Sequence, residues 1–271
     1  MSRGRLQNLG TQAVARLWLF AALVAFWEIW ARTSEESYFP PPSTILPTMR
    51  DVWFSGPASH LFLNDKAIAD FVPSLTHLFA GWILASLIGI VLGVALGRSR
   101  TAAEFLDPLL QLGRAVPPPT LIPFFIIVFQ FGAAMHTAAI IFGVIWPVLL
   151  NTIDGARSVD AVQLDTARVF GITGAQRLWR LILPAAMPKI FAGLRVSLSL
   201  AIILMVVSEL VGSTTGIGSH LLTTQRTFEI PNMWAGIVLL GILGYAFNEA
   251  LLLVERRLLA WHTGVQRLAD A

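Results

Sequence analysis

Six long apolar runs dominate the sequence, and they restrict the chain to folds that can exist within a membrane. A helical span needs about 20 apolar residues, because backbone groups in lipid must find their hydrogen-bond partners within the same segment. Charged residues make up 13% of the 271 residues, against about 25% in a typical soluble domain. The sequence therefore predicts an all-α, polytopic membrane protein with about six transmembrane helices. The runs extend over about residues 17–30, 71–97, 116–131, 135–150, 190–211 and 231–254.

The Lys and Arg residues are unevenly distributed, and their distribution predicts how the helices are oriented. With six spans, 14 of the 19 basic residues fall on the side of the two termini and 4 fall on the opposite side. The remaining one, Arg195, lies within a span. Basic residues concentrate on the cytoplasmic side of membrane proteins. Both termini are therefore expected in the cytoplasm.

This topology divides the chain into segments of different environment. A cleaved signal peptide is the alternative for the first run, but no small-x-small cleavage site follows it, which favours an uncleaved span. Three consecutive prolines at residues 40–42, within the linker, are expected to hold the chain extended at that point. The predicted segments are a cytoplasmic tail over 1–16, a first transmembrane helix over 17–31, a periplasmic linker over 32–70, a five-helix core over 71–257 with a cytoplasmic loop at 151–189, and a cytoplasmic tail over 258–271.

The cytoplasmic loop contains a polar and basic stretch, Ser158–Pro184, between two strongly apolar runs. Its first half has the period of a short helix, and Gly171 is expected to end that helix with a positive φ. Thr173 and Gln176 have the spacing of a capping box for a second helix, which Pro184 is expected to end. One side of the first helix is predicted to carry Val159, Val162, Thr166, Val169 and Phe170.

The same stretch resembles the EAA loop of the membrane subunits of ABC importers. That pattern is Glu-Ala-Ala, three residues, Gly, nine residues, then Ile-x-Leu-Pro. Here the corresponding residues are Asp165-Thr166-Ala167, Gly171 and Leu181-Ile182-Leu183-Pro184, with matching spacing and conservative replacements. The stretch is interpreted as a docking site for a soluble partner rather than as an ordinary loop. A DNA-reading helix-turn-helix is disfavoured because both of its ends lead into the membrane.

The resemblance extends from Phe39 to Arg257 and includes the glycine-rich stretch 212–218. It is to the nitrate, sulfonate, taurine and bicarbonate branch of type I, binding-protein-dependent permeases in the bacterial inner membrane. It implies a homodimer with two cytoplasmic ATPase subunits and a periplasmic or lipid-anchored solute-binding protein, importing a small solute such as one of these anions. It also implies that the ATPase is contacted by Asp165, Thr166, Ala167, Arg168, Gly171, Leu181, Leu183 and Pro184.

The sequence predicts no enzymatic activity for this chain. It lacks the Gly-x-x-x-x-Gly-Lys-[Ser/Thr] pattern that holds nucleotide phosphates, and no zinc-type ligand cluster or catalytic triad stands out. We therefore expect no cofactor or metal on this chain, ATP and Mg²⁺ to be used by the partner ATPase, and no binding of nucleic acid.

A stripe of the span at 190–211 is a candidate translocation path. On a helix, Arg195, Ser199 and Glu209 fall within about 80° of arc, and charges within a span usually face a bundle interior or a wet cavity. Arg195 would attract an anion, and Glu209 would help to form an outer gate. The two are about 21 Å apart along the axis and cannot pair. The alternative is that Arg195 extends to the cytoplasmic interface and Glu209 caps the glycine-rich turn.

Small residues recur at every fourth position of the second run. Such a stripe allows another helix to approach closely. The residues are Gly81, Ala85, Gly89, Gly93 and Gly97.

A secondary transporter or channel subunit driven by an ion gradient is the alternative functional class. Such proteins usually carry acidic residues at membrane depth and often contain internal repeats. The sequence shows no repeat, and only Glu28 and Glu209 lie clearly within or near the predicted spans, with Glu249 close to the inner edge of the last one. The importer permease is therefore favoured.

Overall fold

The computed structural model describes residues 3–34 and 37–260, and their side chains from Trp18 onward. No strand occurs in these ranges, so the prediction of an all-α chain is confirmed. The described residues form two compact units, which are treated separately below. The first contains the residues up to Ile68 together with His220–Leu239, and the second contains Ala69–Ser219 and the residues from Leu240 on.

The first unit is built around a long helix, α1 (Arg3–Thr33), whose described outer surface is strongly apolar. Near its end, Glu28 accepts hydrogen bonds from Arg32 Nε (2.5 Å) and from the backbone N–H of Ser43 (3.0 Å). Ser43 lies in the first turn of α2 (Pro42–Trp53), where an acidic partner satisfies a free backbone donor. Glu28 therefore joins the two helices.

The linker after α1 differs from the extended chain that its prolines predicted. Pro41 is extended, with φ −65° and ψ 142°, but Pro42 is the first residue of α2. Proline is well tolerated there, because the first helical N–H has no intrahelical partner to lose. Beyond α2 the unit contains a short 3₁₀ turn, η1 (Ala58–His60), and the first residues of α3 (Asp65–Arg98).

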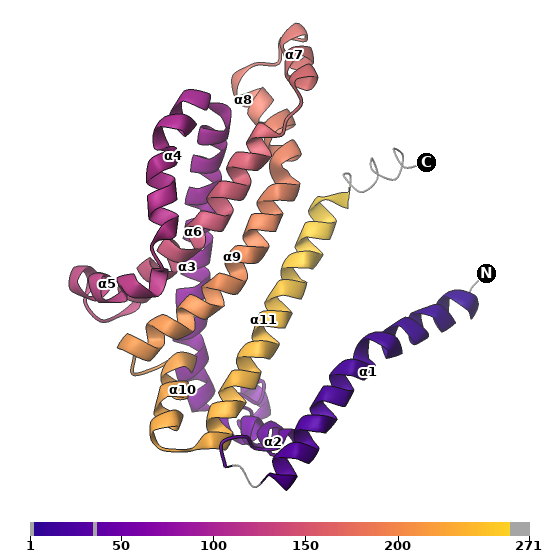
Figure 1. Ribbon diagram of the computed structural model, residues 1–271, viewed down its shortest axis with the longest axis vertical. Helices are drawn as coiled ribbons and strands as arrows, with labels where there is room; N and C mark the ends of the chain where they lie inside the picture. Colours follow the sequence, from indigo (N-terminus) through magenta and orange to yellow (C-terminus); the bar gives the residue numbers. More distant parts are fainter. Residues whose placement is uncertain (1–2, 35–36, 261–271) are drawn as a thin grey trace. The chain divides into compact units, whose positions relative to one another are not determined.

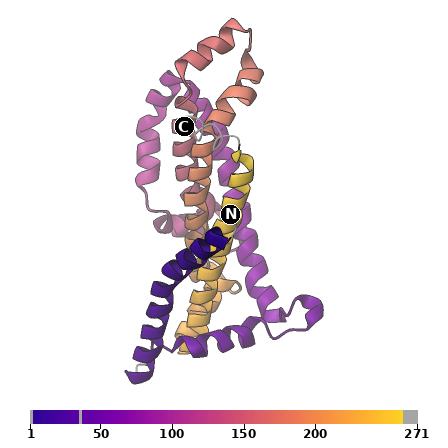
Figure 2. The ribbon, with the colours of Figure 1, turned by 90° about the vertical axis from the view of Figure 1, so that its right-hand side faces the viewer.

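The second unit contains most of α3, the helices α4 to α9, the start of α10 and the later part of α11. Its core lies where α3, α6 and α9 pack together (Figure 1). The core residues include Leu78 of α3, Ile140 and Val144 of α6, and Leu198 and Met205 of α9, all of them buried. Figures 1 and 2 both show α7 at one end of this unit, beyond the ends of α6 and α9. From α4 on, the helices of the chain are α4 (Arg100–Ala115), α5 (Ile122–Phe129), α6 (Ala133–Arg157), α7 (Ala161–Val169), α8 (Gly174–Arg177), α9 (Leu183–Gly212), α10 (Ile217–Arg226) and α11 (Ile230–Leu258). The part of α10 from His220 on and the part of α11 up to Leu239 belong to the first unit.

The predicted stripe of small residues on α3 packs directly on α6. A Cβ added at Gly93 would lie 2.5 Å from Cβ of Thr152, and one added at Gly97 would lie 2.7 Å from Cβ of Ala156. Ala85 on the same stripe is fully buried. The expectation of a close helix approach is confirmed.

This approach leads to a stability prediction. We expect Gly93→Ala to lower the free energy of unfolding by about 1–3 kcal/mol, because the extra methyl overpacks the α3–α6 contact. The control is Gly241→Ala in α11, where an added Cβ has no atom within 4 Å and alanine favours the helix. Denaturant unfolding of both variants in mixed micelles measures the difference. Equal stabilities would contradict the packing argument.

The number of spans is only partly settled by the helices that the structure describes. Among the described residues, four segments are long and apolar enough to cross a membrane: Ala58–Arg98, Ala133–Arg157, Gly174–Gly212 and Ile230–Leu258. A fifth is possible if Arg100–Ala115 and Pro118–Phe129 count as one broken span, bent by 84°. The total of six spans and the cytoplasmic position of both termini stay predictions.

The predicted span over residues 116–131 starts irregularly and is interrupted, as the proline within it, Pro123, indicates in the sequence. Pro118 begins a 3₁₀ turn, η2 (Pro118–Leu121), and α5 then ends at Phe129, where the next residue, Gln130, has φ 59°. Prolines remove backbone donors and fix φ, which prevents a regular helix from continuing through them. The eight residues of α5 extend only about 12 Å, too short for a hydrocarbon core of about 30 Å.

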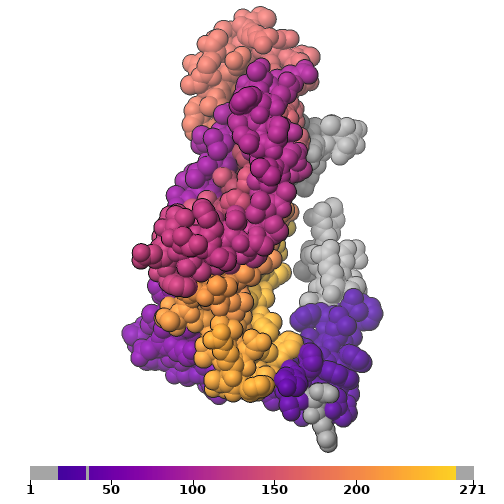
Figure 3. Space-filling model, turned by 60° about the vertical axis from the view of Figure 1, so that its left-hand side comes forward, coloured from indigo at the N-terminus to yellow at the C-terminus, as the bar shows by residue number. Residues whose placement is uncertain are grey.

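Helix α4 occupies the segment that the sequence analysis treated as a connection. Leu106 and Leu110 on one side of α4 pack against Leu149 and Trp146 of α6, while Phe105 on the opposite side is 79% exposed. In Figure 3, α4 and α5 (magenta) cover one face of this unit. An apolar outer surface of this kind suits contact with lipid.

Candidate functional site

The first half of the loop at 158–184 folds as predicted, into a short helix that ends in a glycine turn. Asp160 caps α7, its Oδ1 accepting the N–H of Val162 at 2.9 Å. At the other end Gly171 has φ +67°, and the N–H of Ile172 donates to the carbonyl of Ala167 at 2.8 Å. Glycine is favoured here because a Cβ destabilises the left-handed conformation.

The second half of the loop differs from the prediction in two respects. Helix α8 does begin after Thr173, but the Thr173 side chain makes no capping hydrogen bond, so the predicted capping box is wrong. Gly174, the first residue of α8, has φ +53°, and this turn of the backbone departs from the geometry of a capping box.

Pro184 does not end the second helix, contrary to the prediction. A π-helical turn, η3 (Leu178–Ile182), follows α8 and leads into α9, with Pro184 in the first turn of α9. The wider π-helical turn changes the hydrogen-bond pattern just before the proline, where a regular helix would lose a donor. The loop is therefore joined to a core helix through unbroken helical structure.

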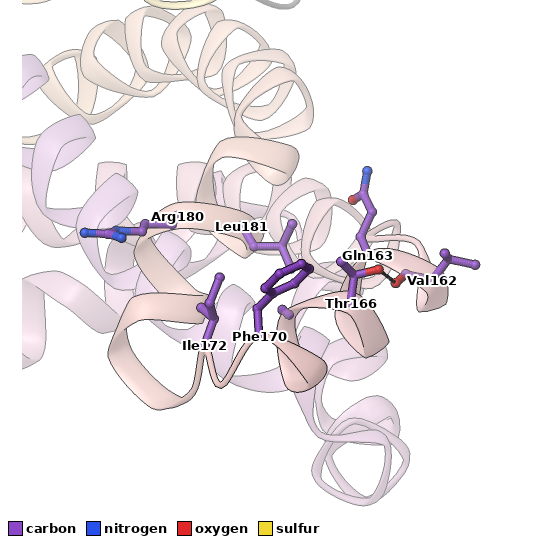
Figure 4. Close-up of a pocket in the computed structure, with 8 residues that line it drawn as sticks. Val162, Gln163, Thr166, Phe170, Ile172, Arg180 and Leu181 are labelled. Atoms are coloured by element: carbon purple, nitrogen blue, oxygen red, sulfur yellow. Dashed lines mark hydrogen bonds between the residues drawn. The ribbon is translucent and has the colours of Figure 1, made fainter.

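A pocket of about 350 Å³ opens between α7 and the chain that returns towards α9. Phe170 and Leu181 lie next to each other within it, and Thr166 holds its place through a hydrogen bond to the carbonyl of Val162 at 2.7 Å (Figure 4). The pocket is lined by Val162, Gln163, Thr166, Ala167, Phe170, Ile172, Arg180 and Leu181.

Large apolar side chains stand exposed in the lining of this pocket and at residues next to the lining in the sequence. Val169 is 84% and Phe170 75% exposed, and Val162 and Trp179 are exposed as well. Exposed apolar groups gathered in this way on a polar loop mark an interaction surface. We call these four residues and the pocket the loop patch. The sequence analysis did not single out Trp179, although a tryptophan in a polar, basic stretch could have indicated it.

The predicted ATPase-contacting residues do not share one environment. Asp165, Thr166, Arg168 and Gly171 are exposed, and Asp165 pairs with Arg168 at 2.7 Å in a solvated ion pair of little energetic weight. Ala167 is buried beneath the loop. Leu181 lines the pocket. Leu183 and Pro184 are half-buried in the first turn of α9.

Arg195 has a partner that the sequence analysis did not identify. Its Nη2 donates to Oε2 of Glu255, so the two charges join α9 to α11. Both side chains are partly exposed, and Nε of Arg195 is buried without a partner. The sequence analysis offered two interpretations of Arg195, attraction of an anion and extension to the cytoplasmic interface. Neither of them predicted an ion pair with Glu255. A role in the translocation path stays a prediction.

Glu209 is fully buried and caps the glycine-rich turn, as the alternative interpretation stated. Its Oε2 accepts hydrogen bonds from the N–H of Gly218 and from Oγ of Ser74, both at 2.9 Å. Ser199, by contrast, is exposed. The residues predicted to form one stripe therefore lie in different surroundings within this chain, and the outer-gate role of Glu209 stays a prediction.

Among the described residues, no group of three or more His, Asp or Glu side chains is placed to hold a metal ion.

Comparisons with known proteins point to one family. Residues 71–259 match the family described as binding-protein-dependent transport system inner membrane component. The putative aliphatic sulfonates transport permease protein SsuC of Bacillus subtilis is 32% identical, over 92% of this chain and 88% of its own. The taurine transport system permease protein TauC of Escherichia coli is 30% identical, over 95% and 93%. The nitrate import permease protein NrtB of a Synechocystis strain is 27% identical, over 87% and 85%.

A solved structure shares the fold. A chain of the MetNI methionine ABC transporter, in an inward-facing conformation, superimposes with a TM-score of 0.61 over 69% of this chain and 93% of its own. Its sequence identity is 18%, so the likeness concerns the fold alone.

Proposed function

This chain belongs to the family of binding-protein-dependent transport system inner membrane components, and from that membership we propose that it imports a small anion in an ATP-driven assembly. In this proposal the chain supplies the membrane path. A solute-binding protein delivers the anion from outside, and two ATPase subunits on the cytoplasmic side use ATP and Mg²⁺. A second copy of the chain completes the path in the bacterial inner membrane.

The loop patch is the observation that supports coupling to the ATPase. Two of its four exposed apolar side chains, Val162 and Phe170, line the pocket, and all four stand on a loop that continues into α9 without a break in helical structure. A partner seated on the patch would bury these side chains, which is favourable at roughly 25 cal/mol per Å². Movement of that partner would be transmitted to α9 through the helical connection.

The nature of the anion is proposed from the relatives. Those with substrates in their names handle aliphatic sulfonates, taurine, nitrate and bicarbonate. Each of these solutes has an anionic group of delocalised oxygen atoms, which a guanidinium can bind through two parallel hydrogen bonds. Arg195 supplies such a group within the membrane helices.

Reconstitution tests this function directly. Proteoliposomes containing the chain, its ATPase and its solute-binding protein are expected to accumulate at least one of taurine, an alkanesulfonate, nitrate or bicarbonate when ATP is supplied inside. The control lacks the ATPase. Accumulation driven by an ion gradient in that control would instead support the secondary transporter alternative.

Gly171 gives a prediction about coupling. An added Cβ at Gly171 would have no atom within 4 Å, so the Cβ of Gly171→Leu meets no neighbour in this chain, and the φ of +67° is what the substitution strains. A residue with a Cβ destabilises this conformation by roughly 1–2 kcal/mol. We expect the variant to insert into the membrane normally but to lose substrate-stimulated ATP hydrolysis, because the turn that presents Phe170 is displaced.

The matched control at this position is Gly171→Asn, since asparagine tolerates the left-handed conformation better than other residues with a Cβ. It is expected to keep most of the stimulated hydrolysis. Normal stimulation in Gly171→Leu would remove the glycine turn from the coupling mechanism.

A further inference from the structure

Two exposed turns of the first unit hold bulky apolar residues in a backbone conformation that such residues rarely adopt. Among the described residues, four that are not glycine have a positive φ. One is Gln130, and the other three are Leu61 (φ 55°), Phe62 (φ 64°) and Phe228 (φ 57°). These three are 80%, 61% and 71% exposed. A positive φ is an outlier for a bulky residue, so both turns present apolar side chains outward at a cost in backbone strain.

The first turn, over residues 54–64, is tied to α2 and to itself. The N–H of Gly56 donates to the carbonyl of Phe62 at 2.8 Å, and Nδ2 of Asn64 donates to the carbonyl of Val52 in α2 at 2.9 Å. A Cβ added at Gly56 would lie 2.1 Å from a carbonyl oxygen of the same turn, so the backbone is closely folded there. Figure 2 shows this turn projecting beyond the end of α2. Its conformation is therefore set by specific contacts.

The second turn, which carries Phe228, ends α10 in a Schellman motif. The N–H of Glu229 donates to the carbonyl of Thr224 at 2.9 Å, and the N–H of Phe228 closes the inner bond of the motif. The position of Phe228 in this motif is usually occupied by glycine. Within the first unit, Trp53 at the end of α2 packs against His220 of α10, with ring centroids 4.7 Å apart. The helices that carry the two turns are therefore in contact.

The length of α3 places the first turn outside the lipid. Helix α3 has 34 residues, from Asp65 to Arg98, and extends about 50 Å at 1.5 Å per residue. At the average tilt of about 20° it covers about 47 Å, whereas a bilayer with its headgroups is about 40–45 Å thick. With Arg98 at the cytoplasmic surface, as in the predicted topology, Asp65 and the turn before it stand in water. Lipid therefore does not account for the exposed apolar side chains of this turn.

We propose that these two turns dock the solute-binding protein, and that it covers Leu61, Phe62 and Phe228. This inference rests on the proposed function, in which such a protein delivers the anion from outside. The family is described as binding-protein-dependent, and both turns lie on the outer side in the predicted topology. Exposed aromatic side chains are common anchors at protein interfaces. A backbone that already presents them loses less conformational freedom on binding.

Phe62→Gly and Phe228→Gly test the proposal, because glycine adopts a positive φ without strain. Each variant removes an exposed ring and keeps the backbone conformation, and its elution in size-exclusion chromatography checks the fold. The measurement is the dissociation constant of the purified, solute-loaded binding protein for the full chain assembled with its ATPase in nanodiscs. Each variant is expected to bind at least about tenfold more weakly. Phe105→Ala, exposed on α4, is the control and is expected to bind normally.

A fluorescent label at Ser59→Cys identifies what covers the first turn. Ser59 is exposed beside the proposed contacts, and the chain has no cysteine of its own. The label is expected to report water in nanodiscs and an apolar environment once the binding protein is added. A label that is already shielded before this addition, by lipid or by a second copy of the chain, would overturn the proposal.

The binding data also separate this inference from the proposed function. If the unmodified assembly binds the solute-binding protein and imports solute with ATP, but both glycine variants bind equally well, the function stands and the docking site is wrong. If the unmodified assembly does not bind the solute-binding protein, both are wrong.

Discussion

Phe170→Ala is expected to weaken binding of the proposed ATPase subunit by about 2–4 kcal/mol, or ~30- to 700-fold, as truncation of a central aromatic anchor does. Phe170 is the largest apolar side chain in the pocket lining and is 75% exposed in this chain. A partner seated on the patch could therefore bury most of the surface of this side chain. The measurement is the dissociation constant of the ATPase from the purified chain in nanodiscs, together with substrate-stimulated ATP hydrolysis.

Phe105→Ala is the matched control. Phe105 is also a phenylalanine and is 79% exposed, but it lies on α4, outside the loop patch. The same truncation there is expected to leave ATPase binding unchanged. If Phe170→Ala binds the ATPase as tightly as the unmodified chain, the loop patch is not its docking site.

The ion pair between Arg195 and Glu255 is expected to show a coupling energy of about 1–3 kcal/mol in a double-mutant cycle. Arg195→Gln leaves the Glu255 carboxylate partly buried without its counterion, and Glu255→Gln does the same to the guanidinium. Each single variant should therefore lose stability, and the double variant should lose less than the sum of the two. Denaturant unfolding of the four proteins in mixed micelles measures the cycle. Strictly additive losses would show that the contact does not stabilise the fold.

Uptake by the same four proteins separates stability from transport. If Arg195 binds the transported anion, the double variant recovers stability but still transports poorly at limiting substrate. Glu255→Gln then keeps more of the uptake than Arg195→Gln, because it keeps the guanidinium. Uptake that recovers together with stability in the double variant would remove Arg195 from the path and assign it a structural role.

Several features of this protein follow from local sequence alone. The apolar runs determine where helices can form in lipid, because backbone hydrogen bonds must be satisfied within each segment. The repeat of Gly81, Gly89, Gly93 and Gly97 determines which face of α3 can approach another helix. The turn after α7 follows from Gly171, whose positive φ is a property of one residue. In each case the physical cause acts within a few residues along the chain.

Other features were decided only by the tertiary structure. The size of the bend before Pro118 and the continuation of helical structure through Pro184 depend on what surrounds each proline, and the sequence analysis misjudged the second. The partners of the buried and half-buried charges are distant in sequence: Glu255 lies 60 residues from Arg195, and Ser74 lies 135 residues from Glu209. Which side chains meet across two helices depends on the rotation and axial offset of each helix, and packing of the whole core determines both.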